Sequence, residues 1–150
     1  MNQSTLLTSS RDLYQKLLQD YADFNNDPLS AYKALDCAAV AWHLTDWVFH
    51  EYEKLAFPNV GSMREEFYKS CDDLKTMHDL ATGLKHFTIS NPKSNMSGSH
   101  LHQGGFSRAF SFGFNVSRLE IQYSDKASEP IDLLLERVVN FWSDYFSDKN

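Results

Sequence analysis

The stretch LDCAAVAWHLTDWVFHEYEKL, residues 35–55, decides the fold, because it is apolar on nearly every side when it is wound as a helix. It contains neither glycine nor proline, and its alanines and leucines favour the helical state. Just upstream, Asp27 can cap a helix and Pro28 fits its first turn. We therefore predict one long helix over residues 28–56. A helix that is apolar on two sides is typical of the centre of a domain.

Three other regions have the apolar spacing of amphipathic helices. They cover residues 9–25, 63–85 and 128–146. The middle region is predicted as one helix or two, because Ser62 with Glu65 forms a capping pair at its start and Ser70 with Asp73 can form another inside it. The sequence therefore predicts four to five helices.

The hydrophobic period changes after about residue 86. Residues 106–114 and 119–123 alternate between large apolar and small or polar side chains, which is typical of an antiparallel hairpin with one apolar face. Residues 86–90 (HFTIS) are a candidate third strand, and the polar stretch 91–105 predicts a mobile loop. The predicted fold class is therefore α+β, a bundle of four to five helices with a small antiparallel sheet.

The chain has the size and composition of one soluble domain. Its 150 residues include 42% hydrophobic and 23% charged side chains, enough for one core but not for two ordinary domains. We expect residues 1–150 to form that domain, with residues 1–8 frayed. No apolar run reaches about 18 residues, so we expect no membrane span.

Charge and cysteine content narrow the partners and the compartment. A net charge of -6 with no basic stripe argues against a nonspecific nucleic-acid binder. The N-terminus lacks the pattern of a secretory signal, and two cysteines do not suggest a disulfide framework. We expect a cytoplasmic protein.

A polar strip interrupts the apolar helix. On a helical wheel, Asp46 and Glu53 fall within an apolar face, and His43 and His50 flank that face one turn to either side of Asp46. A carboxylate on a buried face needs a hydrogen-bonding or ionic partner, and the two histidines are the local candidates. The contact between His43 and Asp46 is then either a structural lock between helices or part of a functional site.

A second polar cluster lies at the end of the region 63–85, where Lys85 and His86 leave the helix side by side. The helix dipole favours cations there, which is a sufficient structural explanation. The same pair can also bind an anion, stabilise developing charge or transfer a proton. If the two clusters converge, they form the candidate catalytic set of an enzyme that acts on a phosphate-containing substrate such as RNA. That set is His43, Asp46, Lys85 and His86.

Metal chemistry is the weaker interpretation. His43, Asp46 and His50 have the i, i+3, i+7 spacing of ligands on one side of a helix, and they are weak metal candidates. The pair His100 and His102 lacks the further ligands that a site needs. No HExxH, CxxC, phosphate-binding loop or nucleophile elbow occurs. We expect no cofactor, and the sequence does not decide whether the protein is an enzyme.

Three motifs resemble those of a group of uncharacterised bacterial and prophage proteins, which share Trp-His-xx-Asp-Trp, Ala-Asn-Gly-x-Lys-His-Phe and a terminal Phe-Trp-xx-Phe helix. The matching positions here are Trp42, His43, Asp46, Trp47, Ala81, Gly83, Lys85, His86, Phe87, Phe141, Trp142, Tyr145 and Phe146. Thr82 departs from the pattern, because it stands where the group has asparagine. The resemblance covers residues 31–146 and implies a bacterial or phage cytoplasmic protein with no established activity.

The function favoured by the sequence is that of a soluble binding or interaction protein, phage-, defence- or stress-associated. It would use a protein partner or self-association, and a polar site formed by the central helix and the Lys85–His86 corner. The first alternative is the metal-independent enzyme with a phosphate-containing ligand. The second is a His/Asp metal-binding protein.

Overall fold

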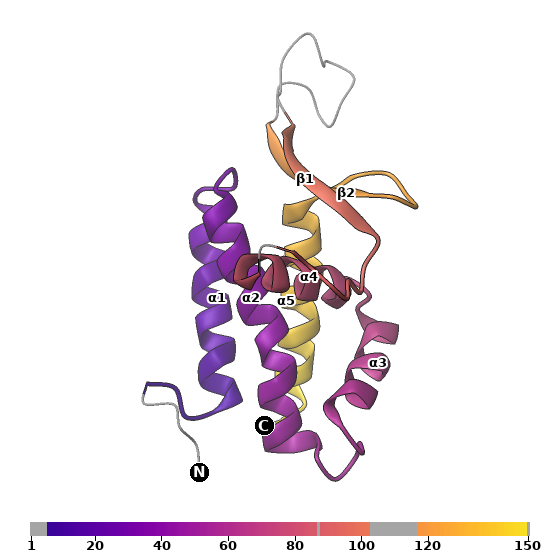
Figure 1. The fold of residues 1–150 in the computed structure, drawn as a ribbon. Helices are drawn as coiled ribbons and strands as arrows, with labels where there is room; N and C mark the ends of the chain where they lie inside the picture. The colour runs from indigo at the N-terminus through magenta and orange to yellow at the C-terminus, as the bar shows by residue number, and fades with distance from the viewer. Residues whose placement is uncertain (1–5, 87, 103–116, 150) are drawn as a thin grey trace.

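The computed structural model describes residues 6–86, 88–102 and 117–149 of the protein. These residues form five α-helices and a three-stranded antiparallel sheet, which confirms the predicted α+β class (Figure 1). In chain order the elements are α1 (Ser10–Asn25), α2 (Ala31–Val48), the π-helical turn η1 (Phe49–Glu53), α3 (Val60–Ser70), α4 (Leu74–Lys85), β1 (Met96–His102), β2 (Arg118–Tyr123), β3 (Glu129–Pro130) and α5 (Ile131–Ser147).

Polar side chains cap the first two helices. Ser9 and Asp12 form a complete capping box at the start of α1. The central helix begins three residues later than predicted, because the Ser30 N–H donates to the Asp27 carbonyl at 3.0 Å and closes a turn. The Ser30 hydroxyl then accepts from the Lys33 N–H and takes the capping role predicted for Asp27.

The central helix also ends earlier than predicted. Its α-helical geometry stops at Val48, and the chain continues as the wider π-helical turn η1. A π turn changes the rotation per residue, so a wheel drawn for an α-helix fails beyond Phe49. The region 63–85 forms two helices, α3 and α4, which is one of the two predicted alternatives.

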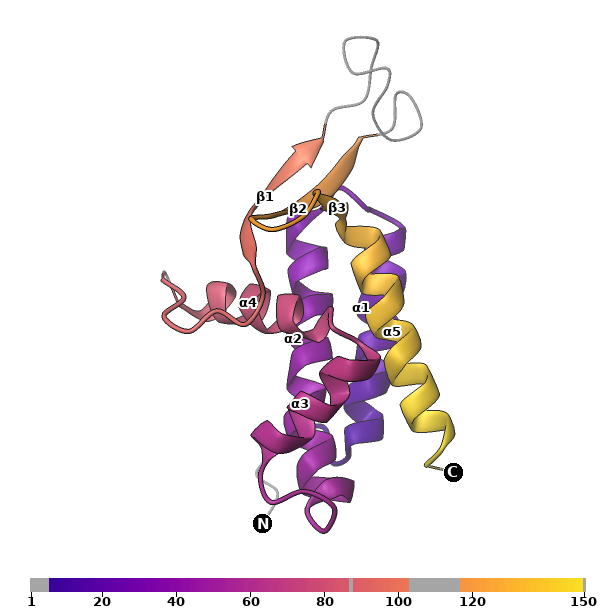
Figure 2. The ribbon, with the colours of Figure 1, turned by 90° about the vertical axis from the view of Figure 1, so that its right-hand side faces the viewer.

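Helices α1, α2 and α5 run side by side, and α4 crosses α2 (Figures 1 and 2). The core between them is rich in large side chains, including fully buried Phe24, Leu44, Trp142 and Phe146. The Trp142 indole N–H donates to the Ala41 carbonyl at 3.0 Å, so the largest core side chain also satisfies its polar atom. None of the helices in the described residues combines the length and apolar character that a bilayer crossing requires.

The sheet lies beyond one end of the helices, in the order β1-β2-β3 (Figure 2). Strand β1 pairs antiparallel with β2, with Ser99 opposite Ile121, and β2 pairs antiparallel with β3, with Glu120 opposite Pro130. The inner residue Ile121 is buried, and it anchors the sheet on the helical core.

Two sequence predictions for this region need correction. Residues 96–102, predicted as part of a mobile loop over 91–105, form strand β1, because backbone pairing with β2 stabilises a strand that its small polar side chains do not signal. Residues 88–90 are not in a strand, and the third strand is β3 instead. The predicted hairpin strand over 106–114 lies outside the described residues.

Candidate functional site

The residues of the polar strip predicted on the central helix do not stay together in the structure. Asp46 was predicted on a buried face, but its side chain is 55% exposed and its carboxylate lies 3.6 Å from the exposed imidazole of His50. The exposed residues of α2 recur at helical spacing, at Tyr32, Asp36, His43 and Asp46. This stripe is the side of α2 that its neighbours leave uncovered, so the carboxylate needs no buried partner.

Residues seven apart share a face of a regular α-helix, but Glu53 does not lie on the same face as Asp46. The π-helical turn η1 intervenes and places Glu53 toward α5, where it accepts a hydrogen bond from the Tyr145 hydroxyl at 2.7 Å. The Lys149 ammonium lies 3.4 Å from the same carboxylate oxygen. Burial, followed by the hydrogen bond to Glu53 and the charge of Glu53, raises the pKa of Tyr145. Its hydroxyl therefore stays protonated and donates at neutral pH. Glu53 therefore connects η1, which follows α2, to α5.

The second predicted cluster lies at the exposed end of α4. Lys85 is its last residue and His86 its C-cap, whose N–H donates to the Thr82 carbonyl at 2.8 Å. Among the described residues, no hydrogen bond or ion pair joins His43 or Asp46 to Lys85 or His86. The candidate catalytic set is therefore not assembled by direct contacts.

An electrostatic link nevertheless joins part of the set. His43 belongs to the exposed stripe of α2, but neighbouring protein atoms still remove part of the water around its imidazole. This desolvation is the largest cause that lowers the pKa of His43, and the positive charges of Arg64 and Lys85 lower it further. The negative charge of Asp46 acts in the opposite direction. The charge on Lys85 therefore acts on His43 without a direct contact, and His43 has an additional cationic neighbour that the sequence did not suggest.

That neighbour, Arg64, extends from α3 across α2. Its guanidinium carbon lies 4.3 Å from the centre of the Trp42 ring, a cation–π contact. Its Nε donates to the Thr45 hydroxyl at 2.8 Å, and that hydroxyl donates to the Trp42 carbonyl at 2.8 Å. No local sequence signal identifies Arg64, because its contacts lie about twenty residues away on another helix.

Helix α4 contributes a histidine that contacts Trp42 and a carboxylate that contacts this histidine. The His78 ring packs edge-on against the Trp42 ring, with centroids 4.8 Å apart. Its Nδ1 lies 2.7 Å from the carboxylate of Asp79, which is only 1% exposed. Asp79 also accepts hydrogen bonds from the backbone N–H groups of Lys93 and Ser94, so its charge is satisfied within the protein.

Metal binding gains no support from the described residues, in which no group of three histidine, cysteine or acidic side chains is arranged to hold an ion. The weak candidates His43, Asp46 and His50 supply only the single contact between Asp46 and His50. His100 lies on β1 with its Nε2 3.1 Å from the buried carboxylate of Glu120, opposite it on β2. This pair joins the two strands.

A groove of about 700 Å³ lies between α3 and α5. Half-buried aromatic rings from both helices form part of its wall, with Phe67 and Phe141 in edge-to-face contact at 5.4 Å between centroids. Its carboxylates come from Glu66, Asp72, Asp73, Asp144 and Asp148. The groove therefore combines an aromatic wall with a strongly acidic lining.

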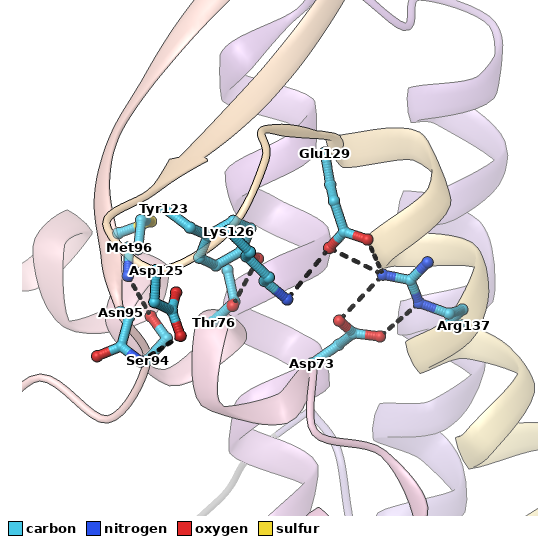
Figure 3. A network of polar contacts seen from close by, with 10 residues as sticks. All are labelled: Asp73, Thr76, Ser94, Asn95, Met96, Tyr123, Asp125, Lys126, Glu129 and Arg137. Carbon is cyan, nitrogen blue, oxygen red and sulfur yellow. Dashed lines mark hydrogen bonds and ion pairs between the residues drawn. The ribbon is translucent and has the colours of Figure 1, made fainter.

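The one basic side chain in this lining is already neutralised. Arg137 donates two hydrogen bonds to Asp73, at 2.6 and 3.1 Å, and its Nη2 lies 3.3 Å from Glu129 (Figure 3). These carboxylates raise the pKa of Arg137, with the Asp73 hydrogen bonds as the largest cause. Beside this network, a cavity of about 110 Å³ is bordered by Thr76, whose hydroxyl lies 3.0 Å from that of Tyr123.

Comparisons with models of protein families, with curated proteins and with solved structures found no match to this chain.

Proposed function

We propose that the protein is a binding protein whose groove between α3 and α5 holds a basic, partly apolar segment of a partner protein. The observation that carries the proposal is the combination of an aromatic wall with five carboxylates in one concave surface. Aromatic side chains and complementary charge are features of protein recognition surfaces.

The charge of the groove indicates that the partner should carry basic side chains. Five acidic side chains and one arginine line the groove, and three of the carboxylates are already paired: Glu66 with Lys69, Asp72 with Lys75 and Asp73 with Arg137. Asp144 on α5 and Asp148, the C-cap of that helix, lie one turn apart, and neither forms an ion pair within the described part of the chain. Lysine or arginine side chains of a partner would supply the missing counter-charges.

The apolar part of the surface selects a second feature of the partner. Phe67 and Phe141 are only partly buried, and they contact each other at the junction of the two helices. A large apolar side chain on the bound segment would cover these rings, and a neighbouring cation would lie over their faces. A second copy of this chain is a poorer occupant, because it carries a net charge of -6.

A synthetic peptide with four lysines around a leucine and a tryptophan provides a direct test. We expect it to bind the wild-type protein in isothermal titration calorimetry at low ionic strength. Replacing its lysines by glutamate should abolish binding, and replacing its leucine and tryptophan by serine should weaken it. Binding should fall with added salt, because exposed charges are screened.

Two double variants with the same change in net charge localise the site. Asp144→Asn with Asp148→Asn should weaken binding about three- to ten-fold, the effect of removing two exposed ion pairs. Asp23→Asn with Asp36→Asn, on exposed parts of α1 and α2, is the matched control and should leave the affinity unchanged. Equal losses in the two double variants, or no binding by the wild type, would overturn the proposal.

A further inference from the structure

We propose that Arg64 and Tyr68 form a binding site for a phosphate group on the side of α3 that faces α2. The site is separate from the acidic groove. Its ligand is an anion, whereas the ligand proposed for the groove is a basic segment. It extends the phosphate-ligand hypothesis, but with residues other than the predicted cluster of Lys85 and His86.

The first argument is that Arg64 is held in place but has unused donors. Its contact with Trp42 and its hydrogen bond from Nε to Thr45 fix the plane of the guanidinium. Within the residues that the structure describes, its two Nη groups make no hydrogen bond, and no carboxylate lies within ion-pair distance. A partly buried guanidinium that is oriented in advance is suited to bidentate recognition of an oxyanion.

The second argument is the hydroxyl of Tyr68, one helical turn after Arg64. The residue is 7% exposed, and its buried hydroxyl has no hydrogen-bond partner among the residues that the structure describes. An unsatisfied buried hydroxyl is costly, and a ligand or ion that accepts its hydrogen bond would remove that cost. Burial raises the pKa of Tyr68 to about 12, and therefore the hydroxyl remains a donor at neutral pH.

The two groups are close enough to affect each other. The positive charge of Arg64 lowers the pKa of Tyr68, and Tyr68 in turn affects the pKa of Arg64. The Lys75 ammonium lies 5.4 Å from the centre of the Tyr68 ring, and its charge is paired with Asp72. Arg64 and Tyr68, one helical turn apart, thus lie on one face of α3.

Four carboxylates, of Asp46, Glu65, Asp72 and Asp79, act on Arg64 or Tyr68 through their charge, and within the described residues none of them forms an ion pair with Arg64. Asp46 acts on Arg64 only at a distance, and it lies beside His50. Asp79 acts on Tyr68, but its oxygens accept hydrogen bonds from Lys93 and Ser94. Asp72 pairs with Lys75 at 2.8 Å. The three donors from Arg64 and Tyr68 therefore remain for a ligand with at least three acceptor oxygens, which favours a phosphate group over a carboxylate.

The test titrates the protein with inorganic phosphate, with methyl phosphate and with acetate at constant ionic strength, by calorimetry and thermal unfolding. We expect inorganic phosphate to bind and to raise the midpoint of thermal unfolding, and acetate to do neither. Tighter binding of methyl phosphate than of inorganic phosphate would identify a phosphomonoester as the ligand class. The opposite order would identify the free anion.

Three variants complete the test. Tyr68→Phe should fold with unchanged or higher stability, because the hydroxyl has no partner in the described part of the chain, and should bind phosphate about ten-fold more weakly. Arg64→Gln should abolish binding. Lys54→Gln, the charge-matched control at an exposed position, should bind like the wild type. Undetectable phosphate binding, equal binding of acetate, or unchanged affinity in folded Tyr68→Phe would overturn the proposal.

Discussion

Ser94 donates two hydrogen bonds to a single carboxylate oxygen of Asp79, one from its backbone N–H at 2.8 Å and one from its hydroxyl. The Lys93 N–H donates to the other oxygen at 2.8 Å. Asp79 lies on α4 and Ser94 just before β1, so this contact ties the connection between helix and strand to the body of the protein. We infer that Asp79 is the residue that positions the sheet relative to α4.

Asp79→Ala should therefore destabilise the protein by about 2–4 kcal/mol, because several charge-assisted hydrogen bonds are lost at once. Urea unfolding followed by circular dichroism measures the effect. Asp46→Ala is the control, since that exposed carboxylate should contribute no more than about 0.5 kcal/mol. Similar losses in the two variants would contradict the structural role assigned to Asp79.

Asp79 also makes the free energy of unfolding depend on pH in the acidic range. Burial raises its pKa and is the largest single cause, but hydrogen bonds from Ser94, Lys93 and His78 together hold the pKa below the ordinary value of 3.8. The unfolded chain then takes up the proton more readily than the folded protein. The stabilisation is complete above about pH 5 and is lost as the pH falls toward the lowered pKa. The difference in unfolding free energy between wild type and Asp79→Asn should shrink from pH 5 to about pH 3, and a constant difference would refute this.

A salt bridge raises the pKa of a histidine, whereas the pKa of His43 should be lowered. Its pKa is lowered from 6.5, mainly by burial and further by Arg64 and Lys85, so the folded protein resists protonation there. The unfolded chain gains the proton first, and this contribution reduces stability as the pH falls below 6.5. In an NMR titration we expect the His43 midpoint below 6.5 and a rise in Arg64→Gln. A midpoint that does not respond to loss of Arg64, but does respond in the Lys54→Gln control, would contradict the assignment.

The two thiols should be unreactive in the folded protein. Burial raises the pKa of Cys37 to about 12 and that of Cys71 to about 11, and the thiolate is the form that reacts with disulfide reagents. An aromatic disulfide such as Ellman's reagent should modify both thiols rapidly in urea and slowly without it. Rapid modification of the native protein would show that at least one thiol is accessible.

The sequence by itself determined the fold class, because hydrophobic period is a local property. The apolar stripes over residues 9–25 and 128–146 lie where the structure has α1 and α5. Strand β1 could not be predicted from its own residues, because its hydrogen-bond partners lie on β2, about twenty residues away. Its small polar side chains resemble those of a loop.

The candidate sites depended on tertiary structure almost entirely. The wheel placed Asp46 on a buried face, but only the positions of the other helices decide which side of α2 is covered. The π-helical turn then separated Glu53 from Asp46, which no pattern in the sequence indicated. Arg64 and Tyr68 were missed because an unused donor is defined by the absence of contacts from distant segments. Local periodicity thus determined the elements, and packing between distant elements decided which polar groups remain available to a ligand.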